Sequence, residues 1–350
     1  MFRKTQISPL LLLFALLVTA ACTPQAPVPN TVTPAPATQT PVPNTVTPAP
    51  ATTASPVCFS PVDILPLAFT PDSSSLLVRG RMGVQIFNLD ILKEASYLQA
   101  SKNIVTAELS PDGRILAWSL DDNTIQLLRI SDQHVLHALS GHTDVVTKLR
   151  FSPDGNLLVS ASHDFSVRVW NLQGEELRSF QPPGEVLGIG ISPDSRLLAT
   201  VPFDGPVALW DLATLAKIKD LGGTGGYDTS DADFSPDGQY VVADLATGLY
   251  LWRVSDGELV WNAVKNSMAV AFSPDGNYLA YADIDDSSKI FISTVDGSKI
   301  VRVLTGHQGP VWALFFSPDS QLLAFTDGSE IQIWRVADGS LRFVGKAACP

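Results

Sequence analysis

The sequence predicts an all-β fold made of seven similar units, each with four short antiparallel strands. A tripeptide of the type Ser-Pro-Asp, preceded by a large apolar residue, occurs seven times between residues 69 and 320. Its prolines are 40, 42, 40, 43, 38 and 44 residues apart, and the copies together cover nearly all of residues 58–350. Four short apolar or alternating segments fill each interval, as expected for consecutive β-strands separated by turns.

The third copy shows the order of elements within one unit. Strands are predicted at residues 145–151, 156–162, 167–172 and 176–180, and the Ser-Pro-Asp turn separates the first strand from the second. Proline presets φ for a tight turn, aspartate bonds back to the backbone, and glycine accepts a positive φ at the fourth place. Three copies carry serine at that place, so we expect their turns to tolerate a Cβ atom. The seven turns are FTPDS (69–73), LSPDG (109–113), FSPDG (151–155), ISPDS (191–195), FSPDG (234–238), FSPDG (272–276) and FSPDS (316–320).

These repeats resemble those of the WD-repeat family. Besides the turns, the resemblance rests on Trp210-Asp211, on two Gly-His pairs at residues 141–142 and 306–307, and on a large apolar residue that ends each third strand. The seven residues at that last position are Phe87, Leu128, Trp170, Trp210, Trp252, Phe291 and Trp334. The resemblance implies a seven-bladed β-propeller of four-stranded antiparallel blades around a central channel. Tol-type propellers also use such turns, but they usually lack the third-strand tryptophan and rank second.

The first 22 residues have the layout of a bacterial lipoprotein signal peptide. Arg3 and Lys4 precede an apolar run from Ile7 to Val18, and TAAC (19–22) resembles a lipobox although it carries Thr19 in place of the usual leucine. We therefore expect lipidation of Cys22 and a folded part outside the cytoplasm, anchored to the cell membrane. Ordinary signal cleavage and an uncleaved anchor are the alternatives.

Residues 23–57 form a second segment of different composition. They carry no charge and include a tandem copy, PVPNTVTPAPATQT (27–40) and PVPNTVTPAPATTA (41–54). Because proline lacks a backbone donor and prevents helix formation, we expect a disordered, extended linker. At about 3.1 Å per residue, this linker would reach on the order of 100 Å. The third segment, residues 58–350, is the predicted propeller.

The acidic charge of the chain narrows the class of partner that it can bind. The full chain has a formal charge of −12, and removal of the signal peptide leaves 21 basic and 35 acidic residues. No basic cluster interrupts this pattern, which argues against binding to nucleic acid.

With Cys22 lipidated, the cysteines Cys58 and Cys349 remain. A propeller brings its first and last blades together, so we predict a Cys58–Cys349 disulfide in an oxidising compartment.

The family resemblance implies a buried hydrogen-bond network in the third repeat. It comprises His142, Ser160 (or Ser162), Asp164 and Trp170. Serine, histidine and aspartate also make up hydrolase triads, but we expect a structural role because fragments of the group recur in other repeats and no GxSxG motif is present. The chain is not expected to be an enzyme.

No metal or other cofactor is expected. His134, His137 and His163 lack a second histidine or cysteine at metal-ligand spacing. Two acidic turns carry carboxylates of the kind that bind calcium, one with Asp121 and Asp122 and the other within residues 283–286. Both fall where polar turns are expected, and neither has the glycine and distal glutamate of an EF-hand loop.

Two features are candidate contacts for a partner. Trp312 lies near the start of an innermost strand, where it can appear at the channel mouth. Tyr227 lies in the glycine-rich insertion 222–233, a loop that joins two blades. The innermost strands carry five charged residues, which we interpret as too few and too dispersed for a dedicated site: Glu108, Lys148, Arg150, Asp231 and Asp233.

Together these observations favour a membrane-anchored, extracytoplasmic scaffold for protein interactions. The partner is expected to be a protein, the membrane is contacted through the N-terminal lipid, and the propeller is expected to be monomeric. The alternative is an enzyme or a small-ligand or calcium receptor that uses the central channel. Both interpretations rest on the fold class, which does not by itself fix function.

Overall fold

The computed structural model describes residues 45–46, 57–58, 65–91, 93–223, 225, 231–263, 269–283, 289–307 and 309–346. They contain β-strands and turns, and none of them is helical. Accordingly, no helix in this described part has the length and apolar character needed to cross a bilayer. Cys22, Tyr227, Asp285, Asp286 and Cys349 lie outside the described residues, so the predictions made for them stay predictions.

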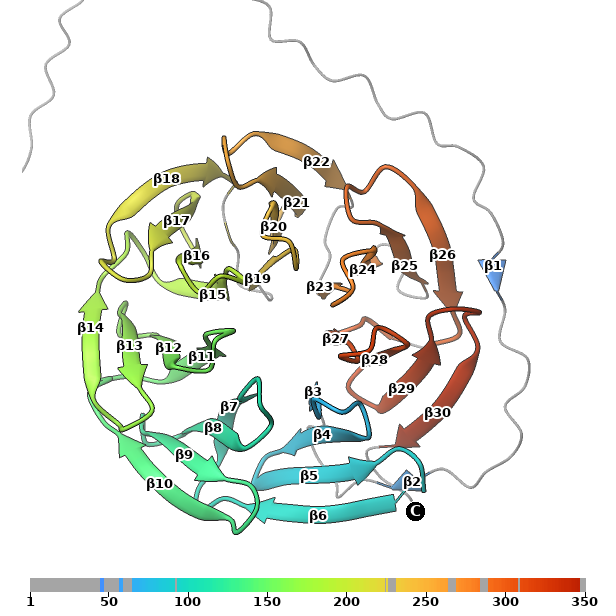
Figure 1. Ribbon diagram of the computed structural model, residues 1–350, viewed down its shortest axis with the longest axis horizontal. Helices are drawn as coiled ribbons and strands as arrows, with labels where there is room; N and C mark the ends of the chain where they lie inside the picture. The colour runs from blue at the N-terminus through green and yellow to red at the C-terminus, as the bar shows by residue number, and fades with distance from the viewer. Residues whose placement is uncertain are drawn as a thin grey trace, which may run out of the picture. The chain divides into compact units, whose positions relative to one another are not determined.

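The described residues form seven four-stranded antiparallel blades arranged in a ring, which confirms the predicted seven-bladed propeller (Figure 1). Blade 1 consists of β3 (Leu65–Phe69), β4 (Ser75–Gly80), β5 (Gly83–Asn88) and β6 (Lys93–Gln99). Blade 2 consists of β7 (Ile104–Leu109), β8 (Ile115–Leu120), β9 (Ile125–Arg129) and β10 (His134–Leu139). Blade 3 consists of β11 (Val146–Phe151), β12 (Leu157–Ser162), β13 (Val167–Asn171) and β14 (Glu176–Phe180).

The second half of the ring repeats this arrangement. Blade 4 consists of β15 (Val186–Ile191), β16 (Leu197–Pro202), β17 (Val207–Asp211) and β18 (Lys217–Gly222). Blade 5 consists of β19 (Asp231–Phe234), β20 (Tyr240–Leu245), β21 (Gly248–Arg253) and β22 (Leu259–Ala263). Blade 6 consists of β23 (Val270–Phe272), β24 (Tyr278–Asp283), β25 (Lys289–Thr294) and β26 (Ile300–Thr305). Blade 7 consists of β27 (Ala313–Phe316), β28 (Leu322–Thr326), β29 (Glu330–Arg335) and β30 (Leu341–Lys346).

Each blade is built from four consecutive strands, so no blade combines strands from the two ends of the propeller. Two dipeptides that precede the first blade pair with the outer edges of other blades. β1 (Thr45–Val46) pairs in parallel with β26, and β2 (Val57–Cys58) pairs in parallel with β30, with Cys58 opposite Lys346. An outer strand presents unpaired backbone groups, and these proline-free dipeptides have the donors to pair with them.

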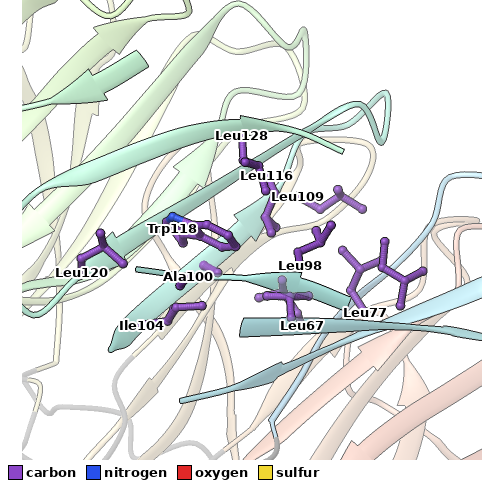
Figure 2. Packing of buried hydrophobic residues seen from close by; sticks show 13 residues of the cluster. Leu67, Leu77, Leu98, Ala100, Ile104, Leu109, Leu116, Trp118, Leu120 and Leu128 are labelled. Atoms are coloured by element: carbon purple, nitrogen blue, oxygen red, sulfur yellow. The ribbon is translucent and has the colours of Figure 1, made fainter. Parts of the chain in front are cut away.

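The buried apolar residues of the described part form seven clusters, one at each joint between neighbouring blades. Figure 2 shows the cluster between blades 1 and 2, in which Leu77, Leu98 and Trp118 pack together with almost no exposed surface. The cluster that closes the ring joins Phe69 and Phe87 of blade 1 to Phe343 of blade 7. Burial of a large apolar side chain contributes about 1.5–3 kcal/mol. The closing joint is therefore held by the same kind of packing as the other joints.

The seven Ser-Pro-Asp turns share one hydrogen-bond pattern. The hydroxyl at the first position donates to the aspartate two residues later, at 2.6 Å from Ser110 to Asp112, and the same oxygen accepts the backbone N–H of Ile115. The fourth residue has φ between 58° and 73° in every copy, including the three serines. Serine at that position carries a conformational cost that glycine avoids.

The three turn serines each accept a hydrogen bond from the preceding blade. The backbone N–H of Asp154 donates to Ser195 Oγ at 3.1 Å, and that of Asp275 donates to Ser320 Oγ at 3.0 Å. The third bond runs from Asp319 to Ser73 Oγ at 3.3 Å and links blade 7 to blade 1. The sequence indicated that these turns tolerate a Cβ atom. The structure adds the reason for serine, which is a link between two blades.

Candidate functional site

Blade 3 brings the four predicted network residues together. Trp170 Nε1 donates to Ser160 Oγ at 2.8 Å, Ser160 Oγ lies 2.7 Å from His142 Nε2, and His142 Nδ1 lies 2.9 Å from Asp164 Oδ2. The N–H on Nδ1 donates to the carboxylate, which leaves Nε2 to accept the Ser160 hydroxyl proton. The result is a chain of hydrogen bonds that links the second and third strands to the loop before the first.

The protonation states in this network follow from burial and hydrogen bonding. Burial lowers the pKa of His142, although its bond to Asp164 acts in the opposite direction. Burial alone would raise the pKa of Asp164, but bonds from Ser166, from the Thr143 backbone and from His142 hold it well below the usual range. A neutral imidazole beside an ionised carboxylate matches the hydrogen-bond directions above.

The network has the connectivity of a hydrolase triad but not its accessibility. Ser160 is fully buried, and its oxygen already accepts the Trp170 proton. A nucleophilic hydroxyl must reach a substrate carbonyl, which this position does not permit. The geometry therefore favours a structural role for the group.

Equivalent positions in other blades use different partners. In blade 4, Trp210 Nε1 donates to Thr200 Oγ1 at 2.8 Å, so threonine takes the role of Ser160. In blade 7, Phe325 occupies that place, and Trp334 donates to Gln332 at 2.9 Å while His307 packs against the Phe325 ring. The complete chain of blade 3 is thus one of several ways to satisfy the indole donor.

The central channel holds a charged cluster that the sequence interpretation had judged dispersed, and that judgement was wrong. In blade 3, Arg150 Nη1 lies 3.3 Å from Glu108 Oε2 of blade 2, and Arg150 Nη2 lies 2.7 Å from Asp231 Oδ2 of blade 5. Lys148 lies 3.3 Å from the same Asp231 oxygen, and the charge of Asp233 acts on both Glu108 and Arg150. The closed ring brings these innermost strands face to face, so residues far apart in sequence become neighbours.

The acids of this cluster have perturbed pKa values. Burial raises the pKa of Glu108 to about 7 and that of Asp233 to about 6, and Arg150 limits both shifts. Asp231 also lies in a site that disfavours charge, but Arg150 and Lys148 hold its pKa below the usual range. Perturbed acids gather at functional sites more often than elsewhere. The channel is thus the strongest candidate for chemistry or binding in the described part of the chain.

A cavity of about 930 Å³ opens at the channel mouth. Its lining includes the deep groups Glu108 and Arg150 and, nearer the rim, Asp121 and Trp312. Trp312 precedes β27, is 43% exposed, and lies beside the turn between β28 and β29. We call the side of the ring that carries the turns between second and third strands the connection face. Trp312 is thus exposed beside the channel mouth, where the sequence had allowed either a packing residue or a contact residue.

Sequence reasoning missed Asp244, which lines the same cavity. It lies on β20 directly opposite Asp231 of β19. The signal was present in the sequence, since Asp244 interrupts the apolar second strand YVVADL (240–245), but it was not singled out.

The acidic turn of blade 2 is internally paired. Asp122 accepts from Lys102 at 2.6 Å and from Thr124 at 2.6 Å, and these bonds lower its pKa to about 2. Asp121 accepts from Asn103 at 2.7 Å. Within the described ranges, no group of three or more His, Cys, Asp or Glu side chains is placed to hold a metal ion.

Sequence comparison matches the repeats seen in the fold. The WD domain, G-beta repeat family matches residues 133–171 and 298–335. Each matched stretch begins at the fourth strand of one blade and ends with the third strand of the next, so the sequence repeat is offset by one strand from the structural blade.

Individual relatives align over most of the propeller. The chain is 33% identical over 247 residues to the meiotic recombination protein rec14 of Schizosaccharomyces pombe, an overlap of 68% of this chain and 66% of that protein. It is 26% identical over 273 residues to the COMPASS component SWD3 of Saccharomyces cerevisiae, 74% of this chain and 83% of the relative. It is also 26% identical over 296 residues to apoptotic protease-activating factor 1 of Rattus norvegicus, but this covers only 22% of that protein.

The matched repeats and the seven-bladed ring lead to the same assignment. Each matched stretch ends one residue after a third-strand tryptophan, Trp170 or Trp334. The chain therefore forms a seven-bladed β-propeller whose repeats at residues 133–171 and 298–335 match the WD domain, G-beta repeat family.

Proposed function

We propose that this propeller is a non-catalytic scaffold that binds a protein partner through its connection face. The observation that carries the proposal is Trp312, a large aromatic residue that is 43% exposed beside the channel mouth. Met82 and Phe165, in second-to-third-strand turns of blades 1 and 3, are 41% and 52% exposed on the same face. Exposed aromatic residues next to a concave site are frequent anchors of protein interfaces.

The location of the scaffold is part of the proposal and rests on the sequence alone. The charged start, the apolar run and Cys22 support export and lipid attachment, and the proline-rich residues 23–57 would act as a spacer. The proposal places the monomeric propeller outside the cytoplasm with a protein partner there. Mass analysis of the mature N-terminus tests this part: an acylated Cys22 supports it, and an intact Met1 contradicts it.

The interface itself is tested by substitution and capture. The full chain carrying Trp312→Ala is compared with wild type and with Ile218→Ala, a control on an outer strand whose side chain is 48% exposed. Crosslinking and capture from solubilised membranes should give a partner that is lost with Trp312→Ala and retained with Ile218→Ala. Equal capture by all three proteins would contradict binding through the connection face.

A further inference from the structure

The outer edge of blade 5 is an open strand edge. β22 is the last strand of its sheet, on the outer rim of the ring, and among the described residues no further strand pairs with it (Figure 1). Its sequence, LVWNA (259–263), contains no charged residue, and Leu259 is 50% exposed. Exposed strand edges are commonly protected by charged residues or by a covering segment. The edge of β22 is therefore a candidate docking site for an extended segment.

The next two blades show what covers such an edge. β1 pairs in parallel with β26 of blade 6, and β2 pairs in parallel with β30 of blade 7. Both are uncharged dipeptides that contain valine, with a proline one or two residues before them. The occupant of each covered edge is thus a short extended segment from the part of this chain that precedes the blades.

Blade 5 resembles the two covered blades at the start of its outer strand. Leu259 of blade 5, Ile300 of blade 6 and Leu341 of blade 7 occupy the same register position, next to the shift between third and fourth strands. Ile300 and Leu341 are half-buried, whereas Leu259 is exposed. The corresponding residues of blades 1, 3 and 4 are charged: Glu94, Glu176 and Lys217. Blade 5 therefore has the kind of edge that is covered in blades 6 and 7.

The chain contains an identical copy of β1. The tandem repeat places Thr31–Val32 fourteen residues before Thr45–Val46, within the same pentapeptide NTVTP. Twelve residues take the chain from Thr45 on blade 6 to Val57 on blade 7. Fourteen residues in the opposite direction are enough for one further step, to blade 5. The direction also fits, because the chain passes blade 6, blade 7 and blade 1 in that order at β1, β2 and β3.

We propose that Thr31–Val32 pairs in parallel with the outer edge of β22, as β1 does with β26. Transferred to blade 5, the register of β1 puts Thr31 beside Asn262 and Val32 beside Ala263. Backbone hydrogen bonds to the open edge supply the affinity, as in other cases of strand addition. Each copy of the tandem repeat then covers one blade. This contact is separate from partner binding at the connection face, so either can fail without the other.

The pairing sets the length of the tether. This consequence rests on the proposed lipid anchor at Cys22. With Thr31–Val32 on β22, residues 23–30 are the part of the linker between the anchor and the ring. At about 3.1 Å per residue they reach on the order of 25 Å, against on the order of 100 Å for residues 23–57. The propeller would then stay close to the membrane.

The experiment is hydrogen exchange of the full chain, resolved to single residues by mass spectrometry. Val32→Pro removes one backbone donor and fixes φ, so it prevents pairing at that position. Gln39→Pro is the matched control, because it adds a proline to the same repeat copy outside the dipeptide. The outward-facing amides of residues 259–263 should exchange at least threefold faster in Val32→Pro than in wild type, and Gln39→Pro should match wild type. Val46→Pro should speed exchange in β26 and leave β22 unchanged.

Three outcomes would overturn the proposal. Equal exchange of β22 in wild type and Val32→Pro would show that the dipeptide does not cover this edge. Protection that increases with protein concentration would assign the occupant to a second copy of the chain. A photo-crosslinker in place of Thr33 should attach to a peptide that contains residues 259–263, and attachment to another blade would contradict the assigned edge.

Discussion

Replacing Ser160 with alanine should destabilise the propeller far more than the loss of one exposed hydroxyl. Ser160 is fully buried and bonds at 2.8 Å to Trp170 Nε1 and at 2.7 Å to His142 Nε2. Ser160→Ala leaves an indole donor and an imidazole acceptor unpaired in the core. Each unpaired buried group costs about 1–3 kcal/mol, so for the two groups we expect a loss of about 2–6 kcal/mol in the free energy of unfolding.

The assay is urea unfolding monitored by tryptophan fluorescence, with Thr200→Val as the matched variant. Among the residues that the structure describes, the Thr200 hydroxyl bonds only to Trp210 in blade 4, so this variant leaves one donor unpaired and keeps the side-chain shape. It should lose about half as much stability as Ser160→Ala. A double-mutant cycle with Trp170→Phe should show coupling of about 1 kcal/mol or more. A loss below about 0.5 kcal/mol for Ser160→Ala would refute the assigned hydrogen-bond chain.

Three further predictions concern ring closure and pH. Ser73→Ala should lower the free energy of unfolding by about 1 kcal/mol, because it removes the hydrogen bond from Asp319 and keeps a positive φ that is costly for alanine. Ser73→Gly should be near neutral, because glycine adopts this φ without that cost. Equal urea midpoints for the two variants would contradict this prediction. Burial raises the pKa of Glu108 to about 7, so its contribution to stability is present at pH 4.5 and is lost as pH rises through 7. Glu108→Gln should therefore reduce the fall of the melting temperature between pH 5 and 8. An unchanged dependence of the melting temperature on pH would argue against this. Intact-mass measurement with and without reductant should show a Cys58–Cys349 disulfide, and two free thiols would exclude it.

The repeat was predictable because short stretches of sequence determine it. Seven Ser-Pro-Asp turns, with alternating segments between them, determine strand number and order through short-range turn chemistry and side-chain periodicity. The blade 3 network was also accessible, since its residues recur at fixed positions in the resembled family. Trp118 shows the limit of that approach, because it occupies in blade 2 the place of Ser160 and donates to Gln126.

The channel cluster could not be predicted from one repeat at a time. Glu108, Arg150 and Asp233 each lie two residues before the serine of their own turn, so the ring places them at one level of the channel. Lys148 and Asp231 lie two residues earlier, at the next level. Aligning the innermost strands by register would have revealed both levels. Their ion pairs depend on side-chain reach across the channel, which the sequence alone does not contain.

The three turn serines make the seven joints of the ring unequal. The joints between blades 3 and 4, 6 and 7, and 7 and 1 carry a hydroxyl link, whereas glycine stands at the turn of the other four. Because every blade is contiguous in sequence, the joint between blades 7 and 1 is where the ring closes, and the bond from Asp319 to Ser73 adds there to the pairing of β2 with β30. The joint that closes the ring is therefore held by backbone and hydroxyl hydrogen bonds as well as by apolar packing.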